Sequence, residues 1–198
     1  MRRIAAILSV VLLAGCASAP GIPETTYFRL PPPAEVPGRE APLFEEPVVV
    51  ETFLADGLHS DQALLYALDA DATRLRAYHY QLWVDPPVRM LQRRLVRVLR
   101  RADVAPLVLD RIGASQSAVR VHGRIERFER VPAGEGWIAS VALGLRVDDG
   151  SERPLLVRRY REDVPAAGPG VADSVRAFGE ALDRIHAAFI ADLETAAR

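Results

Sequence analysis

The stretch VRVHGRIERFERVPAGEGWIASVALGLRV, residues 119–147, contains two runs in which apolar and polar residues alternate. In the first run the alternation starts at Val119 and is broken at Phe128, which predicts a β-bulge. The second run, 137–147, keeps a strict period of two, and the turn residues 134–136 separate the runs. A period of two is typical of strands with one buried face. The stretch therefore predicts two long antiparallel strands joined by a hairpin.

Further strands are predicted on both sides of this hairpin. Asp149-Gly150 is a strong hairpin signal after the second run. The turn residues 69–73 lie between two β-favouring runs and predict another hairpin. The run 27–30 lies in a Pro-rich stretch, so it is predicted as an edge strand that Pro31 ends. Outside the opening stretch, the predicted strands are 27–30, 48–54, 63–68, 75–83, 107–109 and 155–161.

Two amphipathic helices are also predicted. The first has Asp85 as its N-cap and Pro86 in its first turn, and it ends before Pro106. The second follows the loop 165–170 and carries a long apolar stripe. That stripe either packs on the sheet or pairs with a second copy of the chain, and we favour packing on the sheet. In that arrangement the core includes Phe178 and Phe189.

The order of strands, helix, strands and helix predicts an α+β fold. We expect a two-layer α/β sandwich, in which two amphipathic helices cover one face of a mainly antiparallel sheet. The length of 198 residues suits one such domain with a tail.

The N-terminus has the features of a lipoprotein signal peptide. Met1-Arg2-Arg3 is a positive n-region, and residues 4–13 form an apolar run far shorter than the roughly 20 residues of a transmembrane helix. The run ends in Leu13-Ala14-Gly15-Cys16, which resembles the lipobox of bacterial lipoproteins. We therefore expect Cys16 to carry a diacylglycerol and a fatty acyl chain. An Asp after the Cys usually retains lipoproteins at the inner membrane, and Ala17 in its place predicts the periplasmic face of the outer membrane.

These features divide the chain into three parts. Residues 1–15 are the predicted lipoprotein signal peptide, and residues 16–26 are the lipidated N-terminus and tether. Residues 27–198 form the predicted single domain, of which 27–47 are Pro-rich with the short edge strand.

Composition excludes several classes of function. All 25 basic residues are Arg, so a Walker A loop and a Schiff-base lysine are both excluded. One Cys excludes an intrachain disulfide, and a net charge of −1 gives no basis for nucleic-acid binding. No metal-binding His spacing, hydrolase elbow or pair of facing carboxylates is recognisable. The sequence therefore predicts no enzyme activity, and no cofactor or metal besides the lipid on Cys16.

The first predicted helix has an arginine-rich face with no acidic residue between Arg89 and Arg101, formed by Arg89, Arg93, Arg94, Arg97, Arg100 and Arg101. This face is either a contact surface for anionic headgroups or an acidic partner, or a solvated face. We favour the solvated face but keep the other as a hypothesis. Its candidate contact residues are Arg89, Arg93, Arg97 and Arg100.

The order of these features, taken together, resembles a known family, the ABC-type transport auxiliary lipoproteins or PqiC-like family. The similarity spans nearly the whole mature chain, although each motif alone is loose. The matching features behind the lipobox are Tyr27-Phe28-Arg29-Leu30-Pro31, Val48 to Val50, Phe53-Leu54-Ala55, Tyr66, Leu82-Trp83 before Pro86, and Arg124-Ile-Glu-Arg-Phe128-Glu.

The resemblance implies a fold similar to the predicted sandwich and a non-catalytic accessory role. Such lipoproteins serve systems in which an MCE-domain protein works with an inner-membrane permease and ATPase to move lipids between membranes and protect envelope integrity. Only Cys16 carries over as a functional residue, whereas Tyr66, Trp83 and Pro86 match family positions with structural roles. Self-association stays open. The alternatives are a stand-alone lipoprotein of outer-membrane or lipopolysaccharide assembly and, least supported, an envelope hydrolase.

Overall fold

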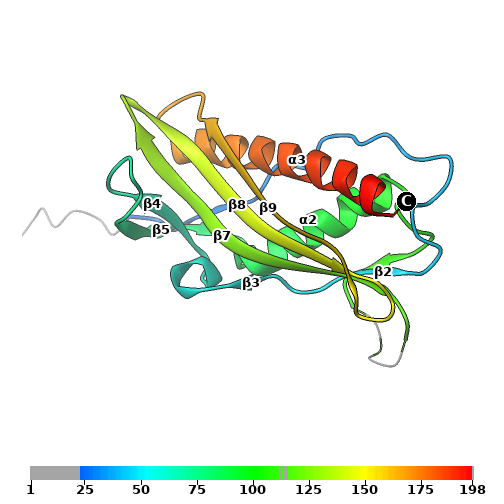
Figure 1. The fold of residues 1–198 in the computed structure, drawn as a ribbon. Coiled ribbons are helices and arrows are strands. Elements are labelled where there is room, and N and C mark those ends of the chain that lie inside the picture. The colour runs from blue at the N-terminus through cyan, green and yellow to red at the C-terminus, as the bar shows by residue number, and fades with distance from the viewer. Residues whose placement is uncertain (1–22, 112, 114–115, 198) are drawn as a thin grey trace, which may run out of the picture.

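The computed structural model describes residues 23–111, 113 and 116–197, which form one sheet with two α-helices packed on the same face (Figure 1). The helices are α2 (Pro87–Arg101) and α3 (Val171–Ala196), with a short 3-10 helix η2 (Gly57–Ser60). The strands are β1 (Thr26–Phe28), β2 (Val48–Val50), β3 (Leu54–Ala55), β4 (Ala63–Ala67), β5 (Leu75–Trp83), β6 (Val108–Leu109), β7 (Val119–Ala133), β8 (Gly136–Asp148) and β9 (Pro154–Pro165).

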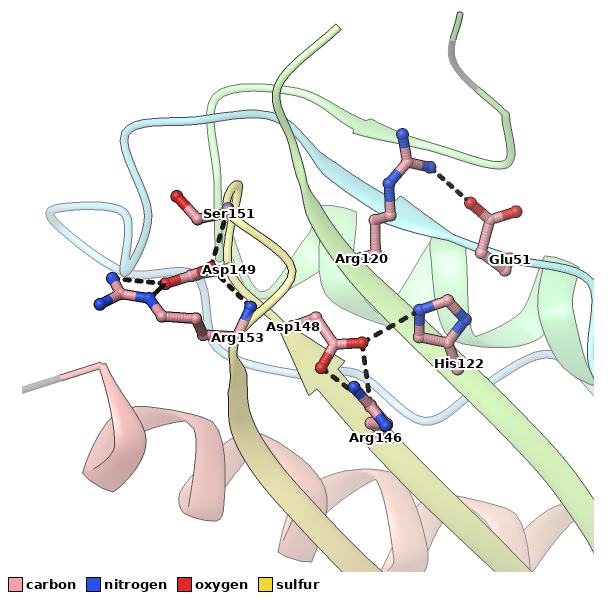
Figure 2. A network of polar contacts seen from close by, with 8 residues as sticks. All are labelled: Glu51, Arg120, His122, Arg146, Asp148, Asp149, Ser151 and Arg153. Atoms are coloured by element: carbon pink, nitrogen blue, oxygen red, sulfur yellow. Dashed lines mark hydrogen bonds and ion pairs between the residues drawn. The ribbon is translucent and has the colours of Figure 1, made fainter. Parts of the chain in front are cut away.

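The opening stretch forms the long hairpin β7–β8, as predicted, and β9 extends it antiparallel to β8. The register shifts between Ile125 and Arg127, so the predicted bulge before Phe128 is confirmed. Gly134 has a φ of 58° at the tip of the hairpin, a conformation that glycine adopts at little cost. The loop to β9 is closed by Asp149, whose Oδ1 accepts hydrogen bonds from the Ser151 and Arg153 amides at 2.8 and 3.0 Å (Figure 2).

The sheet is mixed, so the prediction of a mainly antiparallel sheet is wrong. β8 occupies one edge of β7 along its length, and the earlier strands β2, β3 and β4 join the opposite edge one after another. All three run parallel to β7, and β2 also pairs in parallel with β6. The chain from β2 to β4 advances in the direction in which β7 runs, so each of these strands is parallel to β7. Each pairs with β7 over only two or three residues.

One end of the sheet is built from β4, β5 and β1. The predicted hairpin around residues 69–73 is confirmed, because β4 and β5 pair antiparallel. β1 adds to β5 in parallel, with Thr26 opposite Gln81 and Phe28 opposite Trp83. The N-terminal side of the described chain therefore lies on this end of the molecule (Figure 1).

Helix α3 packs its apolar stripe on the sheet of its own chain, as favoured above, so the stripe is not free to pair with a second copy. Phe178 and Phe189 are buried in the core. Phe178 meets the rings of Phe128 and Trp83 with centroid distances of 4.6 and 5.7 Å. These aromatic contacts link α3 to β7 and β5.

Helix α2 begins one residue later than predicted. Pro86 is the N-cap and Pro87 is the first helical residue, so the assignment of Asp85 as N-cap is wrong. Pro at the first position sacrifices no hydrogen bond, because that amide has no intrahelical partner. The helix ends at Arg101, and Asp103 follows with a φ of 49°. In the described part of the chain, no helix combines the length and the hydropathy needed to cross a bilayer.

Candidate interaction surface on helix α2

The four candidate arginines lie on the outer side of α2. Arg89, Arg93, Arg97 and Arg100 follow one another at intervals of four, four and three residues, and all four are exposed. Residues spaced in this way occupy one face of a helix. Cys16, the predicted lipid attachment site, lies outside the described residues.

Arg94 departs from the predicted arginine face, because it is buried between the two helices. Its guanidinium donates to the carbonyl oxygens of Pro31 and Gly179 and forms an ion pair with Asp183 of α3. Burial lowers the pKa of the Arg94 side chain, and the Asp183 carboxylate opposes that shift. Arg94 therefore joins α2, α3 and the segment after β1, and its placement on the solvated face is wrong.

The outer side of α2 borders a groove against the segment that follows β1. The cavity has a volume of about 430 Å³. Apolar side chains of Leu30, Val84, Met90 and Val96 form part of its lining. Its cationic lining residues that are exposed to solvent, which together define the arginine groove, are Arg29, Arg93, Arg97 and Arg100.

The arginine groove carries an excess of positive charge. Arg93 pairs with Asp85 at 2.9 Å, and the Nε of Arg100 donates to the Val108 carbonyl at 2.7 Å. Within residues 23–111, 113 and 116–197, neither Arg29 nor Arg97 forms an ion pair. Guanidinium groups stay protonated and present several donors in a planar fork, so this groove suits carboxylate or phosphate oxygens.

Arg89 lies beside the arginine groove rather than in it. It lines a neighbouring cavity of about 710 Å³ together with Arg93, which borders both. Asp85 and Asp110 line both cavities, and Glu51 lines only the neighbouring one. The arginine groove therefore has more arginines than aspartates in its lining, whereas arginines and acidic residues are equal in number around Arg89. The structure thus brings three of the four predicted residues together and places Arg89 in a site of balanced charge.

Arg29 and the apolar lining were missed by the sequence reasoning. Arg29 belongs to the run 27–30, which was predicted as an edge strand; the observed strand β1 is Thr26–Phe28, so Arg29 directly follows it. The prediction did not say which strand this run would pair with. Only the parallel pairing of β1 with β5 brings that run beside the start of α2. No sequence signal reports that pairing, because hairpin signals identify only neighbours in the chain.

The residues that match family positions have structural surroundings. Trp83 is buried, with its ring centroid 5.2 Å from that of Phe128. Pro86 caps α2, and Tyr66 stacks on Tyr78 with a centroid distance of 4.5 Å. These contacts agree with the structural roles implied by the resemblance.

A second polar cluster lies where β2, β7 and β8 meet (Figure 2). Both oxygens of the buried Asp148 accept hydrogen bonds from the Nε of Arg146, at 2.8 and 2.9 Å, and Oδ2 also lies 3.3 Å from the Nε2 of His122. Arg120 of β7 pairs with Glu51, next to β2, at 2.7 Å. Asp148 is held by Arg146 of its own strand and by His122 of β7, and Glu51 is held by Arg120 of β7, so the cluster links the segment after β2 and strand β8 to β7.

The comparisons with known proteins agree with this fold. Residues 32–191 match the family described as the ABC-type transport auxiliary lipoprotein component. No curated protein matches the chain in sequence. Among solved structures, protein XCC0632 from Xanthomonas campestris, of the DUF330 family, is 17% identical with a TM-score of 0.73 over 86% of this chain and 96% of that one. The hypothetical protein CT253 from Chlamydia trachomatis is 12% identical with a TM-score of 0.53 over 78% of this chain and 98% of that one.

The structural similarities show the fold, and the family match identifies the chain. That match covers most of the sequence, including α2, most of α3 and every strand from β2 to β9. It also agrees with the resemblance inferred from the lipobox and the order of motifs. The chain belongs to the ABC-type transport auxiliary lipoprotein family, the PqiC-like family, and its role is that of an accessory component in transport.

Proposed function

We propose that this protein is a non-catalytic accessory subunit of an MCE/ABC-type intermembrane lipid transport system. The lipid on Cys16 anchors it at the periplasmic face of the outer membrane, where it helps to maintain envelope integrity. The observation that carries this proposal is the family match over residues 32–191, behind a lipobox that ends at Cys16. The direct partner is a periplasmic MCE-domain protein, and through it an inner-membrane permease and ATPase.

In this proposal the arginine groove contacts an acidic surface of the partner. The excess positive charge on Arg29 and Arg97 supports the assignment, since long-range attraction raises association rates for partners of opposite charge. Apolar residues below the rim, such as Met90, add contact area that holds a bound side chain. In this proposal the arginine groove binds the partner and the lipid on Cys16 anchors the protein, so the two can be tested separately.

The anchor is tested by Cys16→Ala. We expect the variant to stay unlipidated and to leave the outer-membrane fraction, because without acyl chains on residue 16 the domain has no lipid anchor. The measurement is fractionation of cell envelopes, with mass spectrometry of the purified wild-type N-terminus. A variant that still fractionates with the outer membrane would contradict the anchoring mechanism.

The partner is tested by affinity purification of the tagged full-length protein from solubilised envelopes. We expect an MCE-domain protein to co-purify with wild type and to be lost, together with its permease, when Arg93, Arg97 and Arg100 are all changed to Glu. The matched control reverses three exposed arginines elsewhere, Arg153, Arg176 and Arg184, each paired with a local carboxylate. Recovery of outer-membrane assembly proteins without any MCE-domain protein would overturn the proposal in favour of a stand-alone assembly role.

A further inference from the structure

Tyrosines gather at the β4–β5 end of the sheet. Tyr66 of β4 lies opposite Arg76 of β5, and Tyr78 follows Arg76 by two residues, so Tyr66 and Tyr78 lie on the same side of the sheet. Tyr80 lines the same cavity as these two tyrosines. Three of the five tyrosines in the chain therefore share one site.

This surface, which we call the tyrosine face, consists of Tyr66, Tyr78, Tyr80 and the adjoining Leu68. Tyr80 and Leu68 are each 38% exposed. A tyrosine and a leucine that are both exposed therefore form its outer part, unlike the interior of a domain.

A rigid layer supports the tyrosine face from below. Tyr66 stacks on Tyr78 and meets the edge of Trp137 at a centroid distance of 6.4 Å. The buried Arg130 lies 4.1 Å from the centroid of Trp137, and it donates hydrogen bonds to the Tyr78 hydroxyl and to the Ser174 hydroxyl of α3. Since these contacts fix the half-buried rings of Tyr66 and Tyr78, the exposed Tyr80 lies beside an ordered layer.

The chain reaches Cys16 directly from this face. Pro23 and Glu24 line the same cavity, of about 590 Å³, as Tyr66, Tyr78 and Tyr80. Pro23 is the seventh residue after Cys16, and a chain extends at most about 3.6 Å per residue, so the attachment point lies within roughly 25 Å of the place where the tether meets the domain. A lipid on Cys16 therefore holds this end of the molecule against the bilayer.

We propose that the tyrosine face rests in the interfacial layer of the phospholipid membrane that holds the lipid anchor. The proposal depends on the lipidation of Cys16 proposed above. Tyrosine suits this layer because its ring is apolar and its hydroxyl remains hydrated, which explains its enrichment at membrane interfaces. Arg76, exposed on the same face, is placed to meet lipid phosphates. The contact orients the domain, with the far end of α3 pointing away from the membrane (Figure 1).

The test places an environment-sensitive dye on single introduced thiols in the full-length lipidated protein. Leu68→Cys reports on the tyrosine face, Tyr80→Cys provides a second position, and Val157→Cys is the matched control. Val157 is 69% exposed on β9, outside the tyrosine face. In vesicles of phosphatidylethanolamine and phosphatidylglycerol, we expect about a twofold or larger rise in emission at the first two positions, because the dye leaves water, and none at the control.

The outcomes separate the two proposals. Cys16 is the only native Cys, so dye on the wild-type protein would show a free thiol and refute lipidation itself. If wild type takes no dye, binds vesicles, and yet Leu68→Cys and Tyr80→Cys report water, the membrane contact is refuted and the anchor stands. A rise that requires an added envelope protein would also refute the membrane contact, because the face would then bind that protein.

Discussion

At the scale of single residues, Arg94 shows how a charged side chain serves as a structural connection. It lies in a helix whose other nearby arginines are exposed, yet its donors are used by two carbonyl groups and one carboxylate. Burying a guanidinium is costly unless such partners are present. The position therefore needs both the charge and the planar donors of arginine.

We expect Arg94→Met to lower the free energy of unfolding by about 3 kcal/mol, because it leaves Asp183 and two carbonyl groups without their donor. Urea unfolding followed by circular dichroism measures the change. Arg97→Met is the control, since that side chain is exposed, and it should change stability by less than about 0.5 kcal/mol. Equal losses in the two variants would contradict the role of Arg94.

His186 gives a pH dependence at the same scale. Its ring is buried in α3, and burial, aided by the nearby Arg94 charge, lowers its pKa to about 3. In the unfolded chain His186 has an ordinary pKa near 6.5, whereas in the folded chain the ring stays neutral down to about pH 3. The unfolded chain therefore binds more protons between these values. The free energy of unfolding is highest above pH 6.5 and falls as the pH is lowered towards 3. We expect protonation of His186 in the unfolded chain to lower the free energy of unfolding by about 2 kcal/mol between pH 7 and pH 5.

The measurement compares wild type with His186→Leu by urea unfolding at both pH values. Both proteins lose stability through their carboxyl groups, but the variant should lose about 2 kcal/mol less, since it has no buried ring to protonate. An identical loss in the two proteins would show that His186 is protonated in the folded state.

At the scale of elements, the sequence reasoning was reliable where a periodic pattern was long. The hairpin β7–β8, its bulge before Phe128 and the core stripe of α3 all follow from alternation or helical spacing. Strand partners were not predictable, because the pairs of β7 with β2, β3 and β4 are short, parallel and distant in sequence. Contacts between segments that are distant in sequence also explain two errors in the candidate site. Arg29 was not included in it, and Arg94 was assigned to the exposed side of α2.

One short parallel contact depends on Gly123. A Cβ at this position of β7 would lie 2.5 Å from the ring of Phe53, which sits between β2 and β3. We expect Gly123→Ala to cost about 1–3 kcal/mol, because the ring and the strands it joins must shift. Gly136→Ala is the control, since its nearest contact is 3.8 Å away.

Thermal or urea unfolding of both variants measures the difference. Gly123→Ala combined with Phe53→Leu should recover part of the loss, because the smaller side chain leaves room for the new methyl group. If the stability losses of the two single variants simply add in the double variant, Phe53 does not hold the β2–β3 segment against β7 by packing on Gly123.

At the scale of the whole molecule, two surfaces have different chemistry. The tyrosine face lies where the tether enters, on β4 and β5, whereas the arginine groove lies along α2. A protein that contacts the bilayer with the first can present the second to a soluble domain in the periplasm. The tether length then controls whether both contacts form together.

Lengthening the tether tests this arrangement. With thirty Gly and Ser residues inserted after Ala19, the root-mean-square reach between Cys16 and Pro23 rises from about 15 to about 34 Å. The effective concentration of the tyrosine face at the bilayer then falls about tenfold. We expect the chain to remain in the membrane fraction while the dye at Leu68→Cys loses most of its emission gain, with Val157→Cys unchanged. Full retention of the gain would contradict a role for the short tether, because the face would then hold the membrane without it.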